Sequence, residues 1–331
     1  MRIPLVPASA FVLLWAFGYP LGALGVTAMS PMALLAIRFA GSAAALGLIA
    51  ALTHRTFPRG RMLAHVAVVG LLTQFLQFGC AYLALQLDVP AVIVALVIAL
   101  NPVATALLAW PVLGTRLRPR QWVGIGVGTA AVLTACLPRV LADASTMGLA
   151  VGLVLLALAG VALGGLYQQR FCGSVDLVAG NSIQLGVALI PTAALALATP
   201  QTISDPLRAA WVLPTMIILS SMVATTLFLR LVNTAGAAAT SMLFTLIPSV
   251  SALLGWGMLG QRPDAGIGVG LVLGAASLVI VAGRRTHIRT LPWRCRHPFD
   301  RREPNSVAAD NRGDVVIPAE AVFGAGESAG R

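Results

Sequence analysis

The fold is decided by the stretch LNPVATALLAWPVLGTR at residues 100–116, because the chain repeats it as LIPSVSALLGWGMLGQR at residues 246–262. Laid over one another at an offset of 146 residues, the two stretches are identical at nine of seventeen positions, and no gap is needed. The same offset matches Val123 with Val269 and Ala91 with Ala237. A period of this length is too long for a solenoid unit and fits one half of a membrane domain that is built twice.

The composition places the chain in a membrane. Apolar residues make up 58% of the 331 residues and charged residues only 10%, whereas roughly a quarter of the residues in a soluble domain are charged. A soluble fold could not cover its surface with so few charges. The formal net charge is +11, but the arginines stand between apolar runs and in the C-terminal tail, as membrane orientation requires. We therefore expect the lipid bilayer, and no nucleic acid, as a partner.

Ten apolar spans, each long enough to cross the hydrocarbon core as a helix, follow one another along the chain. They are predicted at residues 5–26, 31–53, 63–86, 90–113, 121–138, 146–168, 178–199, 210–231, 235–258 and 265–283. The first span is too long for a signal peptide. The prediction is an all-α membrane protein with ten transmembrane helices in two five-helix repeats, residues 1–140 and 141–283. A disordered cytoplasmic tail is predicted at 284–331.

The arginines are unevenly distributed over the connecting loops. If the N-terminus is inside, the outer loops hold only Arg139, Arg208 and Arg262. The inner side then holds the tail and Arg2, Arg55, Arg59, Arg61, Arg116, Arg118, Arg120, Arg170 and Arg230. The positive-inside rule therefore predicts an inner (plasma) membrane protein with both termini in the cytoplasm. Because five crossings per repeat is an odd number, the second repeat is inverted relative to the first. Secondary transporters have this architecture, with a site near the midplane between the halves.

Several stretches resemble the EamA family of the drug/metabolite transporter superfamily. They are WAFG at Trp15–Gly18, LLAIRFAGSA around Arg38 and the two proline-bearing repeat stretches, and the resemblance covers residues 5–283. It implies a ten-helix carrier, often an exporter of amino acids, related metabolites or drugs, but it does not fix the substrate. The family usually carries Gly-Glu where the fourth helix of each repeat ends. Here Thr115 and Gln261 follow the glycines, so no role of that glutamate can be carried over.

Enzymatic chemistry has few residues to support it. The ten spans contain no Asp, Glu or His apart from boundary positions such as His65. The paired aspartates, Ser–His pair or histidine cluster of an intramembrane protease are therefore missing. The cysteines show no metal-ligand spacing. We expect no enzyme, no metal site and no cofactor.

Arg38 is the one charged side chain well inside a predicted span, about 10 Å along its helix from Pro31. A charge at this depth costs several kcal/mol unless it faces a cavity or a partner. One interpretation makes Arg38 an anchor for a substrate carboxylate. The other makes it a fork that satisfies backbone carbonyls between helices, or a side chain that reaches toward the interface. The resemblance places an arginine here whatever the substrate, which favours the structural interpretation. Gln184 occupies the matched position of the second repeat.

Further polar side chains gather at mid-depth. Gln74 and Gln77 share a helix face, and Asn101 directly precedes Pro102. Each alone is explained by helix–helix contacts, because buried amides need partners, but their clustering at one depth predicts a shared cavity. The predicted substrate-binding residues are Arg38, Gln74, Gln77, Asn101, Gln184, Ser221, Thr225 and Thr245, with Trp15, Tyr19 and Tyr82 as aromatic walls.

The sequence thus predicts a secondary transporter that moves a small molecule across the bilayer by alternating access. The direction of export and an amino-acid-like or drug-like substrate come from the resemblance alone. The alternative is a non-transporting scaffold or sensor that acts through its basic tail. A scaffold would fill the space between the halves with Leu and Phe, whereas Gln74, Gln77 and Asn101 favour a polar cavity. The coupling ion and the oligomeric state, including a homodimer, are left open.

Overall fold

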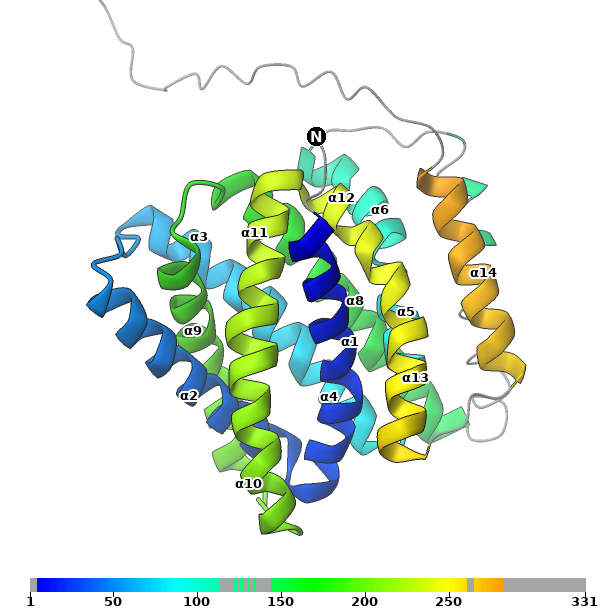
Figure 1. Ribbon diagram of the computed structural model, residues 1–331, viewed down its shortest axis with the longest axis horizontal. Coiled ribbons are helices and arrows are strands. Elements are labelled where there is room, and N and C mark those ends of the chain that lie inside the picture. The colour runs from blue at the N-terminus through cyan, green and yellow to red at the C-terminus, as the bar shows by residue number, and fades with distance from the viewer. Residues whose placement is uncertain are drawn as a thin grey trace, which may run out of the picture. The chain divides into compact units, whose positions relative to one another are not determined.

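The structure, a computed structural model, describes residues 5–113, 144–260 and 265–282, together with scattered positions between 119 and 134 (Figure 1). All named elements in these ranges are helical. Eight helical segments among the described residues are long and apolar enough to cross a membrane. They belong to one compact unit, Met1–Arg285. Most of the predicted fifth span and the predicted tail lie outside the described residues.

The first repeat contributes four described crossings. The first two are single helices, and the third and fourth are built from several segments. Their bounds are α1 Leu5–Ala28, α2 Pro31–Leu52, α3 Arg61–Gly70, the π-helical η1 Leu71–Leu76, α4 Gln77–Gln86, α5 Ala91–Ile98 and α6 Asn101–Leu113.

The second repeat has the same order of elements. Shifted by 146 residues, α2 coincides at both ends with α9 (31 + 146 = 177, 52 + 146 = 198), and α6 coincides with α13 (101 + 146 = 247, 113 + 146 = 259). The bounds are α8 Ala144–Phe171, α9 Leu177–Ala198, α10 Pro206–Thr215, the π-helical η2 Met216–Ala224, α11 Thr225–Ala235, α12 Ala237–Ser241, the 3₁₀-helical η3 Met242–Leu246, α13 Ile247–Leu259 and α14 Ala265–Ala282.

The third and fourth crossings differ from the uninterrupted helices expected at these places. Each third crossing contains a π-helical segment, and the two segments overlap at the 146-residue offset. Such segments often mark functional sites in helices. The fourth crossing of the first repeat breaks between α5 and α6, just before Pro102, because proline has no N–H to continue the helical hydrogen bonds. In the second repeat η3 precedes Pro248 at the matched place.

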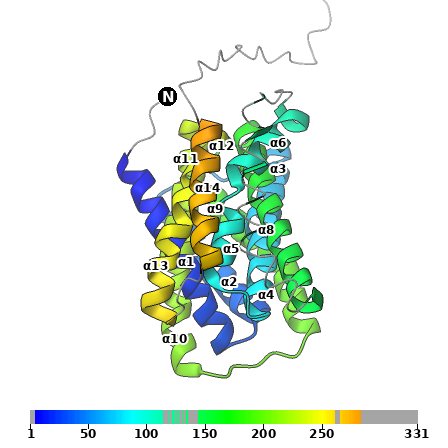
Figure 2. The same ribbon diagram turned by 90° about the vertical axis from the view of Figure 1, so that its right-hand side faces the viewer.

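Loops of the two repeats meet at both ends of the bundle. At the end where α1 finishes, Ser30 N donates to the Thr202 carbonyl at 3.0 Å, and Ser204 N donates to the Ala28 carbonyl at 2.8 Å. We call this the Ser30 end; it is the lower end in Figures 1 and 2. At the opposite, Arg55 end, Arg55 Nη1 lies 3.4 Å from Asp176 Oδ2. The connection after the first helix of one repeat therefore lies beside the connection after the second helix of the other.

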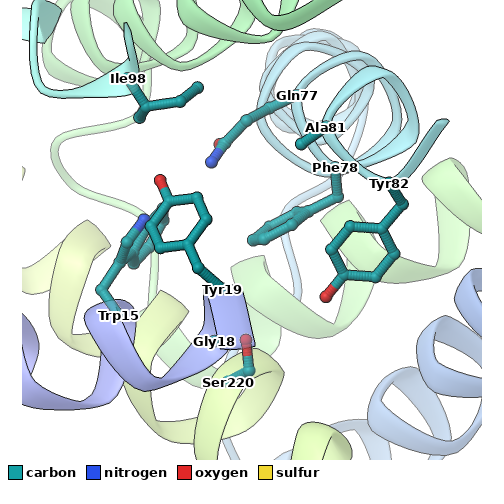
Figure 3. A pocket seen from close by; sticks show the side chains of 9 residues that line it. All are labelled: Trp15, Gly18, Tyr19, Gln77, Phe78, Ala81, Tyr82, Ile98 and Ser220. Atoms are coloured by element: carbon teal, nitrogen blue, oxygen red, sulfur yellow. The ribbon is translucent and has the colours of Figure 1, made fainter. Parts of the chain in front are cut away.

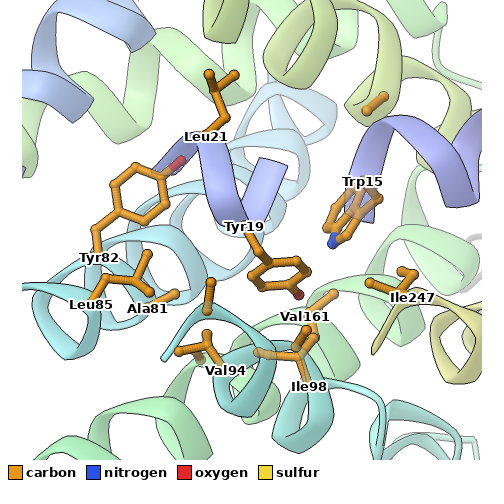
Figure 4. Packing of buried hydrophobic residues seen from close by; sticks show 14 of the residues in the cluster. Trp15, Tyr19, Leu21, Ala81, Tyr82, Leu85, Val94, Ile98, Val161 and Ile247 are labelled. Atoms are coloured by element: carbon orange, nitrogen blue, oxygen red, sulfur yellow. The ribbon is translucent and has the colours of Figure 1, made fainter. Parts of the chain in front are cut away.

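Most of the described interior is one contiguous apolar cluster that joins the two repeats, and a smaller cluster forms around Val66, Val69 and Cys172. The larger cluster includes aromatic and aliphatic side chains of α1, α4, α5, α8, α11 and η3 (Figure 4). The second helices of the two repeats, α2 and α9, pack against each other, and each also packs on the π-helical segment of the other repeat. Arg38 of α2 is thereby brought against η2, more than 180 residues away in the sequence.

Candidate functional site

A small cavity lies among α1, α4, α5 and η2 (Figure 3). It has room for about one water molecule. Three of the helices belong to the first repeat and η2 belongs to the second, so the cavity lies between the repeats. The lining residues are Trp15, Gly18, Tyr19, Gln77, Phe78, Ala81, Tyr82, Ile98 and Ser220.

Two polar atoms of the cavity lining have no hydrogen-bond partner. Gln77 Oε1 is buried and unpartnered, and the buried Tyr19 hydroxyl has no partner beyond a weak contact with the Trp15 side chain; Gln77 and Tyr19 are only 2% and 8% exposed. Figure 3 shows the two side chains pointing toward the same space. Buried polar groups almost always have partners, and leaving one unpaired away from water is costly. Two such atoms at one cavity indicate a place for a polar ligand.

Arg38 is fully buried directly behind the cavity wall. Its Nε donates to Ser221 Oγ at 2.6 Å, Nη1 to the Tyr82 hydroxyl at 2.8 Å and Nη2 to Ser220 Oγ at 3.1 Å. The guanidinium carbon also lies 4.3 Å from the ring centroid of Phe78, a favourable cation–π geometry. The interpretation of Arg38 as a structural residue predicted that backbone carbonyls would accept its hydrogen bonds. That detail is wrong, because three side-chain hydroxyls from two helices take their place.

The charge of Arg38 has no acidic partner among the described residues. The described ranges contain three acids, Asp88, Asp176 and Asp205, and each stands in a connection between helices. The ion pairs that the described residues form lie at the ends of the bundle, Arg55 with Asp176 and Arg208 with Asp205. A buried guanidinium held only by neutral hydroxyls leaves a positive potential around it. Because Tyr82 and Ser220 also line the cavity, that potential favours an anion there.

The remaining predicted site residues lie away from the cavity lining. Gln74 is fully buried, and neither of its amide atoms has a partner. Gln184 Nε2 donates to Gln168 Oε1 at 3.3 Å, and Gln168 Nε2 donates to Asn233 Oδ1 at 3.1 Å. These amides form a separate polar chain through α8, α9 and α11.

The hydroxyl and amide groups of the other candidates bind within their own crossings. Asn101 Oδ1 accepts from Thr105 Oγ1 at 3.1 Å. Thr225 Oγ1 donates to the Ser220 carbonyl at 3.1 Å, and Thr245 Oγ1 donates to the Met242 carbonyl at 2.7 Å. The structure thus brings Trp15, Tyr19, Gln77 and Tyr82 together at one cavity, with Arg38 and Ser221 behind its wall, and leaves the other predicted residues outside it.

Five lining residues were not among the predicted ones: Gly18, Phe78, Ala81, Ile98 and Ser220, which is the neighbour of the predicted Ser221. Helical periodicity could have found two of them. Phe78 and Ala81 follow Gln77 by one and four positions, on or beside the face that carries Gln77 and Tyr82. The sequence marks Gly18 only as the end of the WAFG stretch and does not mark Ile98, because their places in the lining depend on the meeting of separate helices.

A cluster of aromatic rings separates the cavity from the Arg55 end. Trp15 of α1 lies 5.4 Å from Phe228 of α11 and 5.3 Å from Phe244 of η3, measured between ring centroids. Phe11, one turn nearer the start of α1, lies 5.4 Å from Phe244. All four rings are buried. We call Phe11, Trp15, Phe228 and Phe244 the aromatic barrier.

A second set of buried side chains, at the positions that correspond to the aromatic barrier in the other repeat, lies toward the Ser30 end and is mostly aliphatic. At the 146-residue offset the aromatic barrier corresponds to Ala157, Val161, Tyr82 and Ile98, all buried; Figure 4 shows the last three. The elements that carry them pack in the corresponding way, with α8 against α4 and α5 as α1 packs against α11 and η3. We call these four residues the aliphatic barrier. Tyr82 and Ile98 belong both to this barrier and to the cavity lining.

Known proteins are similar to this chain in sequence and in fold. The inner membrane transporter YedA of Escherichia coli (strain K12) is 25% identical over 256 residues, which cover 76% of this chain and 81% of YedA, and YedA of Escherichia coli O157:H7 gives the same values. One solved crystal structure aligns with a TM-score of 0.63 at 16% identity, over 83% of this chain and 96% of that chain, which shows that the folds are alike. The sequence model of the EamA-like transporter family matches residues 4–136 and again 148–283. Because that model accounts for both repeats, the chain belongs to the EamA-like transporter family.

Proposed function

We propose that this transporter works by alternating access, with ten transmembrane helices arranged as two inverted five-helix repeats, residues 1–140 and 141–283, and a cytoplasmic tail at 284–331. The observation that carries the proposal is the cavity between the repeats. It contains unpartnered polar atoms and lies against a buried arginine that has no acidic partner among the described residues. The two sets of buried side chains named above occupy matched positions of the two repeats. A site near the midplane between two repeats is the arrangement that alternating access requires.

The contacts between loops support the inversion of the second repeat. In a parallel duplication, the connection after a first helix and the connection after a second helix would lie on opposite faces of the membrane. Here Ser30 binds Thr202 at one end, and Arg55 pairs with Asp176 at the other. These pairs join a first connection to a second connection, which supports repeats that run in opposite directions.

The arginines support an orientation with the Arg55 end and both termini in the cytoplasm. Arg55, Arg59 and Arg61 stand in and next to the connection that defines that end. Arg208 starts α10 at the Ser30 end and is paired with Asp205 at 3.3 Å. An excess of positive residues on one side of the membrane marks the cytoplasmic side.

The proposed substrate is a small amino-acid-like or drug-like molecule, and the proposed direction is export. The cavity has room for about one water molecule in this conformation, so a substrate enters it only when the surrounding helices move apart. Trp15, Tyr19 and Phe78 would then supply aromatic walls, and Tyr19 and Gln77 polar atoms, for a small substrate with an apolar part. The direction rests on the family resemblance. A scaffold or sensor would gain nothing from unpartnered polar atoms at a cavity, since they lower its stability.

Accessibility of single cysteines tests alternating access without a known substrate. In the full-length protein with its native cysteines changed to serine, Phe244→Cys should react with an impermeant thiol reagent from the cytoplasmic side. Ile98→Cys should react from the opposite side. Ala188→Cys, which is buried in α9 and outside the cavity lining, should stay unreactive. Labelling of Phe244→Cys and Ile98→Cys from one side only, or of neither, would contradict the proposal.

A further inference from the structure

We infer that the substrate carries a carboxylate, and that this carboxylate replaces the Tyr82 hydroxyl on Arg38, which makes Tyr82 a specificity-determining residue. The inference rests on the proposed function, because it places the substrate in the cavity described above.

The fork of Arg38 is oriented for this exchange. Nε is directed away from the cavity, toward Ser221, which does not line it. Nη1 and Nη2 are directed toward Tyr82 and Ser220, and both of these residues line the cavity. Two adjacent N–H groups of a guanidinium bind the two oxygens of a carboxylate in parallel. A carboxylate in the cavity would therefore meet the two donor groups that the Tyr82 and Ser220 hydroxyls now occupy.

Charge favours the exchange. Tyr82 and Ser220 are neutral, and no acid of the described residues balances the buried guanidinium. The present bonds already have a charged donor, but a carboxylate adds a charged acceptor and binds a guanidinium through two parallel hydrogen bonds. A carboxylate would also cancel the buried charge, which a hydroxyl cannot do. A cationic ligand of the same size would meet repulsion instead.

The opposite side of the cavity defines the rest of the ligand. Gln77 Oε1 is an unpartnered acceptor, and the Tyr19 hydroxyl can donate or accept. Trp15 and Phe78 line the space between them and the Tyr82 side. The ligand class is therefore a small carboxylate with an apolar middle and a hydrogen-bond donor at its far end.

The exchange has a consequence for the aliphatic barrier. Tyr82 is the one residue that belongs to this barrier and also binds Arg38. Its hydroxyl ties α4 of the barrier to α2 across 44 positions of the sequence. When a carboxylate takes over Nη1, this tie is lost and α4 is freer to move from α8. Binding of the correct charge would thus favour opening toward the Ser30 end.

The test compares three probes of one size and different charge on the purified full-length protein: phenylacetate, phenylacetamide and phenethylammonium. Binding is measured by calorimetry for the wild type, Tyr82→Phe and Tyr167→Phe. Tyr167→Phe is the matched control, because its hydroxyl also has a partner, His65 Nδ1 at 2.8 Å, but does not line the cavity. We expect the wild type to bind phenylacetate best. Tyr82→Phe should bind phenylacetate about fivefold more tightly, since one competing hydrogen bond no longer has to be broken.

Tyr167→Phe should leave the affinity for all three probes unchanged. Ser220→Ala is a second variant that removes a competing hydroxyl, and it should also tighten the binding of phenylacetate. Equal or weaker phenylacetate binding by both Tyr82→Phe and Ser220→Ala would overturn the inference, as would the absence of phenylacetate binding in every variant. If the cysteine labelling described above still reports two-sided access, the proposed function survives such a result. One-sided labelling would reject the proposed function as well.

Discussion

Gly22 of α1 lies directly against the ring of Tyr82, so that a β-carbon added at position 22 would be 3.0 Å from the nearest ring atom. The Tyr82 ring is buried and its hydroxyl is held by Arg38. It therefore has little freedom to give way. The first helix of the bundle thus fixes the position of the residue that separates Arg38 from the cavity.

The first prediction is that Gly22→Ala destabilises the protein by about 1–3 kcal/mol, the usual effect of adding atoms to a packed interior. Unfolding in detergent, followed by the change in thermal midpoint, measures it. Gly47→Ala in α2 is the control, because an added β-carbon there meets no atom within 4 Å and alanine is the better helix former. If Gly22→Ala is as stable as Gly47→Ala, the close packing of α1 on Tyr82 is not present in the protein.

The second prediction concerns the fork of Arg38. Arg38→Lys should lower stability, because one ammonium on a flexible stem cannot reach Ser221, Tyr82 and Ser220 in the directions of the guanidinium donors. It should keep a weaker preference for phenylacetate over phenethylammonium, because the positive charge remains. Arg38→Gln should lose that preference. Thermal midpoints and probe affinities of the two variants decide between the roles. If Arg38→Gln keeps the preference for phenylacetate, Arg38 serves structure alone.

The third prediction concerns the Arg55 end. Asp176 Oδ1 accepts from Val178 N and Ala179 N, both at 3.0 Å, and so caps α9. Asp176→Ala should cost about 1 kcal/mol, the usual effect of losing an N-cap. Asp176→Asn should cost much less, because it keeps an acceptor for the cap and loses only the half-exposed pair with Arg55, which contributes little. Thermal midpoints of the two variants give the comparison. Equal losses would show that the ion pair matters more than the cap.

Much of the fold could be predicted because the two halves of the sequence align with each other without gaps. The offset of 146 that aligns LNPV with LIPS also aligns α2 with α9 and α6 with α13 at both ends. The π-helical segments could not be predicted. Gly70 directly precedes Leu71–Leu76 and Pro214 lies two residues before Met216–Ala224, but neither residue specifies a π-helical hydrogen-bond pattern, which depends on the packing around the segments.

The candidate site was predictable only in part, for a related reason. Burial of Trp15, Tyr19 and Gln77 at one depth follows from their place in the spans. The partners of Arg38 do not follow from the sequence, because Ser220 and Ser221 lie more than 180 positions away and are brought near only by the packing of α2 on η2. The different side chains of the two barriers can be predicted once the repeats are aligned, since Phe228 corresponds to Tyr82 and Phe244 to Ile98.

The last prediction concerns the driving force of transport. Proton-coupled carriers usually place an Asp, Glu or His where its charge can change as the cavity switches sides. The cavity lining contains none, and Thr115 and Gln261 stand where the family often has glutamate. Arg38 cannot release its proton in a useful pH range. We therefore expect uniport, exchange or coupling through the charge of the substrate. At clamped membrane potential, flux of a carboxylate substrate into proteoliposomes should depend only weakly on an imposed pH gradient.

Two ionisable residues near the helix ends provide the controls for this experiment. His65 is stacked on Phe171, with ring centroids 4.7 Å apart, and is bonded to the Tyr167 hydroxyl toward the Arg55 end. Asp88 stands in the turn between α4 and α5, six positions beyond Tyr82. Because neither side chain lines the cavity, His65→Gln and Asp88→Asn should leave the pH-gradient dependence of flux unchanged. A steep dependence that disappears in Asp88→Asn would instead identify Asp88 as the coupling residue. It would also mean that α4 and α5 turn it inward during the transport cycle.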